Sequence, residues 1–515
     1  MTHQCSPTMN KDMKTKMNAL KPIIWTISGS DCSGGAGIAA DIKTGHVFGV
    51  EVCHLITANT VQNSEEMLAI NPVDVGILEQ QFQALLHDKT PKALKVGMLA
   101  NDEQIQWLIT CIKRLKHSNI DLLVILDPVA TASAGGVTTT ISSEALQQLY
   151  PHIDVITPNL PEAEKLTGIY LGVIDEIAEK FSNFGIKNMV IKGGHSTDYY
   201  CIDHAYQFAC AGTLEHKFSV SSAKIITDYS HGGGCSFATS IAALLSQGHL
   251  LRDALTIAKA FITQGLLVNK SKIHYYGAFE HTCFPKLASS YPQIELTQPL
   301  ISYPTAEFTS LGIKRDGRQS LGLYPVVDSL AWLERLLPLG LEIIQLRVKK
   351  LSGEELSDTI KQAVQLSRKY QTRLFINDHW ELAIKHGAYG VHLGQEDIYL
   401  ADLAAIQRSG IRLGISTHGV YEFLLAQQLR PSYLAIGAIY HTKTKDMTGQ
   451  IQGLETLANT LNVATDIPVV AIGGINHQRA TSVWQTGVDS IAVVTAITEA
   501  DDPEQAVAKF NQQLN

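Results

Sequence analysis

The sequence feature that most constrains the fold is an eightfold alternation of short β-branched runs with amphipathic stretches, beginning at residue 322. Each run is followed by a segment with helical periodicity, such as SLAWLERLLPLG or EELSDTIKQAVQLSRKY. Strands alternating with helices predict a parallel sheet, and eight such units in about 194 residues predict a closed (β/α)8 barrel of the TIM type. An open doubly wound sheet is the alternative. The runs begin at residues 322, 343, 373, 390, 412, 433, 468 and 490.

The chain of 515 residues is too long for one ordinary core and divides in its middle. Between residues 284 and 319 the alternation stops, and a polar stretch is punctuated by prolines, which predicts a linker. All eight cysteines precede residue 284, which suggests modules of different origin. The predicted organisation is a polar tail (1–21), an α/β module (22–283), a linker (284–319) and the barrel (320–515).

Composition excludes several classes of protein. With 45% hydrophobic and 17% charged residues, the chain has enough apolar material for packed cores. A net charge of −8 disfavours binding to nucleic acid, and no segment has the roughly 20 apolar residues of a membrane span or the apolar core of a signal peptide. The cysteines show no C-x-x-C spacing. We therefore expect a cytoplasmic protein with reduced thiols that acts on small molecules; self-association stays open.

Polar residues gather at the carboxyl ends of the predicted barrel strands, where such barrels carry their active sites. Asp378 and Asp397 follow neighbouring strands, and Arg347, Lys349 and Lys445 lie at or near other strand ends. Two carboxylates with several cations suit a diphosphate bridged to Mg²⁺, which takes few carboxylates together with phosphate oxygens. A single aspartate at such a position is more often a helix cap, so the prediction depends on the whole set.

A glycine pair, Gly473-Gly474, ends the seventh predicted strand. Glycines leave their backbone N–H groups unobstructed, and the later strands of this fold often bind phosphate there. The sequence therefore predicts two phosphate-bearing substrates for one barrel.

Six motifs at successive strand ends resemble thiamine phosphate synthase, and the resemblance covers the whole barrel. They are QLRVK (345–349), FIND (375–378), HLGQED (392–397), GIS (414–416), TKTK (442–445) and AIGGI (471–475). The resemblance implies Mg²⁺ on Asp378 and Asp397, and a pyrimidine diphosphate on Gln345, Leu346, Arg347, Val348, Lys349, Asn377, Ser416 and Lys445. It implies a thiazole phosphate against Thr442, Lys443, Thr444, Gly473, Gly474, Val494 and Thr495, the last in place of a serine common in the family.

Two glycine-rich segments mark the first module. SGGAG (33–37) follows the first predicted strand, and SHGGGC (230–235) precedes the apolar stretch SFATSIAALLSQG. Glycines before a helix would direct backbone N–H groups and the positive helix end toward an anion, as phosphoryl transfer requires. A purely structural glycine turn is the alternative.

With KVGML (95–99), LDPV (126–129), TPNLPE (157–162) and KGGH (192–195), these segments resemble hydroxymethylpyrimidine (phosphate) kinase of the ribokinase-like fold. The resemblance implies pyrimidine contacts from Gly29, Asp41 and Gln62, an ATP and Mg²⁺ region with Asn159, Glu162, Gly232 and Gly234, and catalytic roles for Lys192 and Cys235. A thiol near a helix N-terminus can have a lowered pKa, which would allow Cys235 to act as a base. Ser230 and Gly233 stand where the family has threonines, Ala40 replaces a glutamine, and DPVATASAGG (127–136) also departs, so we expect an altered nucleotide side.

The two resemblances together imply consecutive steps of thiamine biosynthesis on one chain. The first module would phosphorylate 4-amino-5-hydroxymethyl-2-methylpyrimidine twice, with ATP as co-substrate and Mg²⁺. The barrel would join the diphosphate to thiazole phosphate and release pyrophosphate. The enzymatic alternative is a pyridoxal-type kinase fused to a thiazole tautomerase-like barrel, and the non-enzymatic alternative is a sensor of pathway ligands. The acidic pair and the TKTK lysines favour the synthase.

Overall fold

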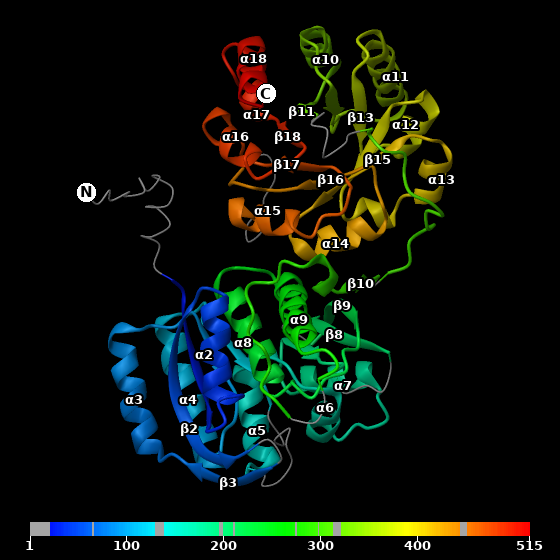
Figure 1. The fold of residues 1–515 in the computed structure, drawn as a ribbon. Helices are drawn as coiled ribbons and strands as arrows, with labels where there is room; N and C mark the ends of the chain where they lie inside the picture. The colour runs from blue at the N-terminus through cyan, green and yellow to red at the C-terminus, as the bar shows by residue number, and fades with distance from the viewer. Residues whose placement is uncertain are drawn as a thin grey trace, which may run out of the picture. The chain divides into compact units, whose positions relative to one another are not determined.

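A computed structural model describes residues 21–63, 66–128, 139–194, 199–209, 212–272, 276–296, 298–312, 321–442 and 451–514. The chain forms two compact units, one with residues up to Lys217 and Ser222–Pro285, the other with Phe218–Ser221 and residues from Lys286 onward (Figure 1). Almost all of the predicted tail lies outside the described residues. The domain limits at 22, 284 and 320 stay predictions.

The first module is a mixed α/β fold whose strands and helices alternate over most of its length. Its strands are β1 (Ile23–Asp31), β2 (Glu51–Gln62), β3 (Met67–Pro72), β4 (Ala93–Val96), β5 (Leu123–Leu126), β6 (Val155–Ile156), β7 (Asn188–Ile191), β8 (Tyr200–Phe208) and β9 (Leu214–Ala223). Its helices are α2 (Gly37–Val47), α3 (Val75–Asp88), α4 (Asp102–Ser118), α5 (Ser143–Leu149), α6 (Leu160–Thr167), α7 (Ile174–Asn183), α8 (Gly233–Ser246) and α9 (Leu251–Val268), with a 3-10 turn at Tyr150–His152. The alternation confirms the predicted α/β class of this module.

The sheet of this module has a topological switch point between β1 and β4. The strand order is β9-β8-β7-β6-β5-β4-β1-β2-β3. A further short strand, β10 (Gln293–Glu295), pairs antiparallel with Ser219–Ser221, which belong to the same compact unit as β10. The strands β2, β1, β4, β5, β6 and β7 are neighbours in this order and run parallel. β3 pairs antiparallel with β2, and β8 pairs antiparallel with β7. Because successive connections leave β1 and β4 in opposite directions, a crevice opens at the carboxyl ends of these strands, where such sheets bind ligands.

Alternate residues of β1 serve different faces of this sheet. Trp25 and Ile27 are buried in the apolar core with residues of α3, α4, α5 and α7. Thr26 points to the other face, where its hydroxyl meets Asp41 of α2. The period of two residues in a strand therefore separates an apolar core from a polar layer beneath the crevice.

The second module is a closed barrel of the strands β11 to β18, each paired in parallel with the next. The strands are β11 (Gly322–Val327), β12 (Ile343–Leu346), β13 (Arg373–Asn377), β14 (Gly390–Leu393), β15 (Arg412–Thr417), β16 (Tyr433–Ile436), β17 (Val469–Ile472) and β18 (Ser490–Val493). The eight predicted strands are confirmed, and barrel closure excludes the open sheet.

Helices surround the barrel on its outside (Figure 1). They are α10 (Leu330–Leu336), α11 (Gly353–Lys369), α12 (Trp380–His386), α13 (Leu403–Arg408), α14 (Val420–Gln428), α15 (Gly453–Leu461), α16 (His477–Trp484), α17 (Thr495–Thr498) and α18 (Pro503–Leu514), with 3-10 turns at Ala288–Ser290, Leu337–Leu339 and Asp397–Tyr399. Within the described ranges, no helix combines the length and apolarity that crossing a membrane requires.

Part of the predicted linker packs on the barrel. The Thr305 N–H donates to Gln407 of α13 (3.1 Å), the Phe308 N–H donates to a barrel carbonyl, and the Ser432 hydroxyl donates to the Thr309 carbonyl (2.7 Å). Phe308 is buried. Residues 305–309 are therefore fixed to the second module, which shortens the stretch that could act as a free tether.

Candidate active sites

A cavity of about 340 Å³ lies at the carboxyl ends of the barrel strands. Arg347 and Lys349 follow β12, Asn377 and Asp378 end β13, and Ser416 lies on β15, so residues distant in sequence converge there because the strands are parallel. The predicted residues that line it are Gln345, Arg347, Lys349, Asn377, Asp378, Asp397, Ser416, Thr442, Gly473, Gly474, Val494 and Thr495.

Two predicted binding residues do not line this cavity. The side chains of Leu346 and Val348 are buried, with exposures of 1% and 8%. The chain alternates here, so Gln345, Arg347 and Lys349 face the cavity while the residues between them do not. Leu346 and Val348 therefore offer no side chain to a ligand in this cavity, and their assignment to the diphosphate site stays a prediction. Lys443, Thr444 and Lys445 lie outside the described residues.

The two predicted metal ligands, Asp378 and Asp397, face each other. Burial and the neighbouring Asp397 carboxylate raise the pKa of Asp378, although Arg347 opposes this shift. Asp378 also has a left-handed backbone (φ 63°), a conformation that costs energy in a residue with a side chain and that clusters at functional sites. Of the described residues, no three His, Cys, Asp or Glu form a metal-holding group. Two repelling carboxylates nevertheless suit a divalent cation that takes its other ligands from phosphate or water.

Two properties require glycine at positions 473 and 474: a backbone with positive φ, and the lack of room for a side chain. Their φ angles are 101° and 64°. A Cβ on Gly473 would lie 2.6 Å from the Ala438 Cα, and one on Gly474 would lie 2.5 Å from the His441 carbonyl oxygen. The pair can therefore present bare backbone to a ligand at the cavity wall, as the sequence suggested.

Tyr324 and Tyr433, which the sequence did not point to, also line this cavity, as does His392, which the sequence placed at the end of the fourth strand without a role. Burial, with a further contribution from Arg347, lowers the pKa of His392 to about 3. The imidazole is therefore neutral. His392 stands inside the HLGQED motif, but its role depends on contacts with other strands, which periodicity does not reveal.

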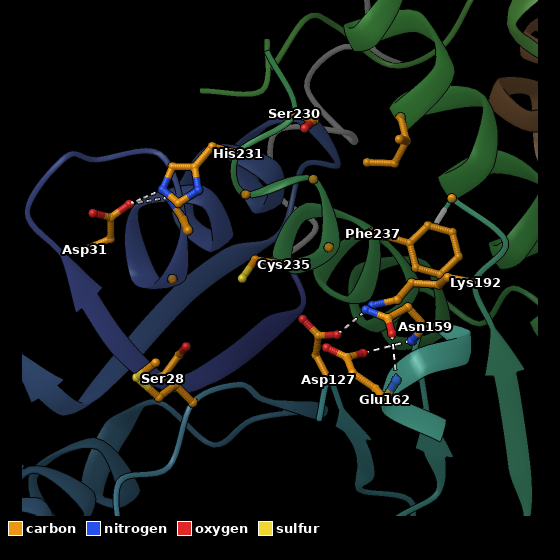
Figure 2. Close-up of a pocket in the computed structure, with 18 of the residues that line it drawn as sticks. Ser28, Asp31, Asp127, Asn159, Glu162, Lys192, Ser230, His231, Cys235 and Phe237 are labelled. Carbon is orange, nitrogen blue, oxygen red and sulfur yellow. Dashed lines mark hydrogen bonds and ion pairs between the residues drawn. The ribbon is translucent and has the colours of Figure 1, made fainter. Parts of the chain in front are cut away.

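The first module has a cavity of about 460 Å³ at the switch point of its sheet. The predicted residues that line it are Gly29, Gln62, Asn159, Glu162, Lys192, Gly232, Gly234 and Cys235. Figure 2 shows Lys192, Asp127, Asn159 and Glu162 gathered on one side, and Asp31 with His231 on the other.

Lys192 is at the centre of a compact charged cluster. Its Nζ lies 2.9 Å from Asp127 Oδ1, and a Cβ on Gly234 would lie 3.6 Å from the same Nζ. Burial alone would lower the pKa of Lys192, but Asp127 and Glu162 outweigh burial and raise it. Lys192 is therefore a fixed cation beside the start of α8, as a phosphate site requires.

Asn159 and Glu162 form a capping box on α6. The Glu162 N–H donates to Asn159 Oδ1 (2.8 Å), and the Asn159 N–H donates to Glu162 Oε2 (2.8 Å). Burial raises the pKa of Glu162 to about 7; Lys192 opposes this rise and Asp127 adds to it. The sequence placed both residues in the nucleotide region, and their capping role fixes the carboxylate in the cavity wall.

The segment before α8 is held against the first glycine-rich turn. Gly232 is the N-cap of α8 with φ 85°, and a Cβ there would lie 1.9 Å from the Gly35 carbonyl oxygen. At Gly233, the first helical residue, a Cβ would meet no atom within 4 Å, so the threonine usual in the family would fit. The space at position 233 therefore does not require glycine.

We expect Gly232→Ala to lower the free energy of unfolding by about 2 kcal/mol or more, because it combines a left-handed backbone with a collision. Thermal unfolding of the whole chain measures this. Gly233→Ala is the matched control, and we expect a change within about 0.5 kcal/mol, since alanine fits the space and the helix. Equal effects at the two positions would contradict the arrangement of this turn.

Asp41 does not line the cavity, so the predicted contact with a pyrimidine is corrected. Its side chain is fully buried in an ion pair with Lys95 Nζ (3.0 Å) and accepts hydrogen bonds from Thr239 Oγ1 (2.7 Å) and from the Thr26 hydroxyl. Both carboxylate oxygens are satisfied by the protein. Asp41 therefore belongs to the polar layer that joins α2 and α8 to the sheet.

Cys235 lines the cavity in the first turn of α8, but its thiol is not a ready base. Burial raises the pKa of Cys235 to about 11, although Lys95 acts to lower it. The sequence reasoning allowed a lowered pKa because of the helix N-terminus. Burial outweighs that effect here, and the thiol is protonated near neutral pH.

Asp31 and His231 also line the cavity and were missed. His231 Nε2 lies 2.8 Å from Asp31 Oδ2, and the Ala36 N–H donates to the same oxygen (2.8 Å). Burial would raise the pKa of Asp31, but these hydrogen bonds lower it well below its usual range. Asp31 lies two residues before SGGAG (33–37) and His231 lies within SHGGGC (230–235), so each was next to or inside a recognised segment. The fold brings the two residues together.

Comparisons with known proteins divide the chain in the same way. The profile of the family described as "Phosphomethylpyrimidine kinase" matches residues 31–278, and that of the family described as "Thiamine monophosphate synthase" matches residues 323–497.

Curated relatives resemble part of the chain. The thiamine-phosphate synthase of Yersinia pestis strain Pestoides F is 55% identical over 192 residues, which are 37% of this chain and 89% of that protein. The thiamine-phosphate synthase of Photorhabdus laumondii is 56% identical over 190 residues, which are 37% of this chain and 88% of that protein. Among solved structures, pyridoxal kinase from Staphylococcus aureus with AMP-PCP is 26% identical, covers 55% of this chain and 100% of its own, and has a TM-score of 0.47.

Proposed function

Because the chain belongs to the thiamine-phosphate synthase family and carries a phosphomethylpyrimidine kinase domain before the synthase barrel, we propose that it performs successive steps of thiamine biosynthesis. The first module phosphorylates 4-amino-5-hydroxymethyl-2-methylpyrimidine and its monophosphate. The barrel joins the resulting diphosphate to thiazole phosphate. The alternative of a pyridoxal-type kinase with a tautomerase-like barrel has less support, because both family profiles name the thiamine steps.

The observation that carries the synthase proposal is the convergence of Arg347, Lys349 and the acidic pair in one cavity with Gly473-Gly474. In the reaction, the bond between the pyrimidine methylene carbon and the diphosphate oxygen breaks, and the electron pair leaves with pyrophosphate. The electron-rich aminopyrimidine delocalises the cation, and the thiazole nitrogen captures it. Arg347 and Lys349 stabilise the departing charge, and the glycine pair holds the thiazole phosphate.

The carboxylates Asp378 and Asp397 would hold the Mg²⁺. The raised pKa of Asp378 supports this, since a cation between the two groups would relieve their repulsion. When bound, Mg²⁺ supplies charge neutralisation for the diphosphate oxygens. The residues of this chain position the substrates and exclude water; no protein nucleophile is required.

In the kinase reaction, the substrate hydroxyl or phosphate oxygen attacks the γ-phosphorus of ATP. The bond from this phosphorus to the β,γ-bridging oxygen breaks, ADP leaves with the electron pair, and the proton of the hydroxyl passes to water. Gln62 and Gly29 line the cavity at the side where the pyrimidine is proposed to bind. Lys192 and the N–H groups at the start of α8 stabilise the transferring phosphoryl group. Cys235 lies at this anion site as a neutral thiol, which suits packing or hydrogen bonding better than proton abstraction.

We expect the affinity for magnesium ATP to rise about tenfold between about pH 6 and about pH 8, because Glu162 loses its proton near pH 7 and the carboxylate helps to hold the cation. KM for ATP, measured across this range, reports the effect. The stability effect runs the other way: since the pKa is raised from 4.5, the contribution of Glu162 to folding is full below pH 4.5 and is lost as pH rises through 7. Glu162→Gln keeps the cap acceptor and should flatten both profiles. A profile unchanged by this substitution would contradict the assignment.

The function is tested by incubating the full chain with hydroxymethylpyrimidine, ATP, Mg²⁺ and thiazole phosphate, and by resolving monophosphate, diphosphate and thiamine phosphate over time. We expect them in that order. If the diphosphate, supplied directly, gives no thiamine phosphate, the synthase proposal fails. If pyridoxal is phosphorylated in preference to the pyrimidine, the kinase proposal fails. Cytoplasmic location and self-association stay predictions that this assay does not address.

A further inference from the structure

Five polar side chains form a continuous chain of hydrogen bonds along the barrel cavity. Gln345 Nε2 donates to the Tyr324 hydroxyl (3.3 Å), and the hydroxyl oxygens of Tyr324 and Tyr433 are 2.9 Å apart. The Tyr433 oxygen lies 2.7 Å from His392 Nδ1, and His392 Nε2 lies 2.7 Å from Ser416 Oγ. The five residues come from β12, β11, β16, β14 and β15 in that order, and all line the cavity.

Burial makes the direction of these bonds matter. Gln345, Tyr324, Tyr433 and His392 are exposed by 5%, 1%, 0% and 7%, so a donor without an acceptor would be costly at each of them. Ser416, at the open end, is half-buried. The hydrogen-bond chain therefore runs from the buried residues Gln345 and Tyr324 to the Ser416 hydroxyl, which can meet a ligand.

Counting donors selects one direction. Because Gln345 Nε2 donates to the Tyr324 oxygen, the Tyr324 O–H is free to donate to Tyr433, and the Tyr433 O–H then donates to His392 Nδ1. A neutral imidazole that accepts at Nδ1 carries its proton at Nε2, which donates to Ser416 Oγ. In the opposite direction, Tyr324 would accept from both Gln345 and Tyr433, and its own proton would have no acceptor among the bonds of this chain.

We propose that this directed chain holds His392 as the Nε2–H tautomer and thereby turns the Ser416 hydroxyl proton toward the substrate. The proposal rests on the synthase function proposed above. His392, Tyr433 and Tyr324 are positioning residues, because they act through Ser416. Since the Ser416 oxygen already accepts from His392, its own O–H is the group left for a ligand.

The direction limits which substrate groups can meet Ser416. A hydroxyl donor needs an acceptor, which a diphosphate oxygen or a ring nitrogen of the pyrimidine provides and the exocyclic amine does not. Arg347 lies close enough to influence His392 and lines the same cavity. A charge-assisted bond from Ser416 to the diphosphate beside Arg347 fits both observations.

Packing around Tyr433 fixes the middle of this chain of hydrogen bonds. The ring of Tyr433 stacks on His392 (5.6 Å between centroids) and meets Phe375 edge to face (5.0 Å). A Cβ on Gly414 would lie 2.2 Å from Tyr433 Cζ, so glycine is needed for the ring to fit. The Tyr433 hydroxyl therefore has little freedom to turn away from His392.

The test is a double-mutant cycle on synthase activity, with pyrimidine diphosphate and thiazole phosphate supplied directly. We expect Ser416→Ala to lower kcat/KM about ten- to hundredfold, and Tyr433→Phe to lower it about three- to tenfold by freeing the His392 tautomer. The double variant should then match Ser416→Ala within about twofold, because Tyr433 acts through that hydroxyl. Effects that multiply in full would overturn the proposal.

A second measurement reads the tautomer directly and does not depend on turnover. In the full chain labelled with ¹⁵N-histidine, the signals of His392 are those that disappear in His392→Gln. We expect an Nε2–H tautomer in the wild type and a mixture of tautomers in Tyr433→Phe. An Nδ1–H tautomer in the wild type would overturn the proposal even if the enzyme is active. Inactivity of the wild type with the expected tautomer would instead overturn the synthase function.

Kinase activity and thermal unfolding of each variant serve as the folding control. If Tyr433→Phe unfolds the barrel, Tyr324→Phe replaces it, because that change also removes a donor from the chain while keeping a ring. The same cycle with Ser416→Ala then applies, with the same expected loss of the Tyr324→Phe effect in the double variant.

Discussion

The Asp397→Asn variant is expected to lose thiamine phosphate formation by about 10²- to 10³-fold while it keeps phosphorylation of the pyrimidine. Asp397 provides one of two carboxylates that face each other in the barrel cavity, and asparagine removes its charge without changing its shape. The Gly394 N–H that donates to Asp397 Oδ2 (3.0 Å) can still meet an amide oxygen. The loss would therefore report the missing charge for Mg²⁺ and diphosphate rather than a change in the loop.

Stability distinguishes this loss from misfolding. Burial and Asp397 raise the pKa of Asp378, so the ion-free site contains an unfavourable charge pair. Removing one charge should leave the melting temperature unchanged or raise it, while activity falls. Such a trade-off between stability and activity is common at functional sites. Synthase rates over a Mg²⁺ titration, kinase rates and Tm are measured on the same protein. Asp358→Asn, on an exposed part of α11, is the matched control and should retain full activity. A fall in Tm together with loss of both activities would contradict the assignment.

The Lys192→Gln variant is expected to lose pyrimidine phosphorylation by about 10²- to 10³-fold while the barrel still converts supplied diphosphate. Lys192 is a cation beside the start of α8, paired with Asp127 at 2.9 Å. Without it, Asp127 and Glu162 would repel the phosphates of ATP. The measurement is kcat/KM for both phosphorylation steps, with synthase activity as the internal reference.

Folding must be checked here, because Asp127 is 3% exposed and would lose its partner. Lys192→Arg keeps the positive charge and the ion pair, and therefore tests whether the compact ammonium group is needed. We expect kinase activity to fall about tenfold or more, which is less than the loss in Lys192→Gln. Lys187→Gln is the matched control, since Lys187 is exposed and its nitrogen lies 3.5 Å from Asp154. Kinase activity within threefold of the wild type in folded Lys192→Gln would mean that Lys192 does not hold the phosphates.

Most of the barrel was predictable because its pattern is local. Each strand is a short apolar run before an amphipathic helix, and seven of the eight predicted strand starts coincide with the observed ones, while the start predicted at 468 lies one residue early. A parallel barrel gathers all strand ends at one mouth, so Gln345, Asp378, Asp397 and Ser416 could be expected in one cavity before any contact was known. The rule does not say which of these side chains face inward: alternation along the chain turns Leu346 and Val348 away from the cavity.

The kinase site was less predictable, because in an open sheet covered by helices the packing decides which helical side chains face the cavity and which face the sheet. Asp41 lies near the glycine-rich turn in sequence, but its side chain faces the sheet and pairs with Lys95. Cys235 stands at a helix N-terminus, yet burial raises the pKa of its thiol to about 11. A sequence motif does not indicate how deeply a side chain such as Cys235 is buried or which way one such as Asp41 points.

From local patterns alone, the amino-acid sequence predicted the number of barrel strands and their order along the chain, α/β architecture in both modules, and twelve residues that line the barrel cavity and eight that line the cavity of the first module. These properties follow from local periodicity and from the rule that parallel strands end at one edge. How those side chains interact depends on the tertiary structure. The pairing of Asp31 with His231, the opposition of Asp378 to Asp397, and the chain from Gln345 to Ser416 join residues on different strands and loops. Hydrogen-bond direction and pKa depend on distances of a few ångströms and on burial, which arise only when the strands close together.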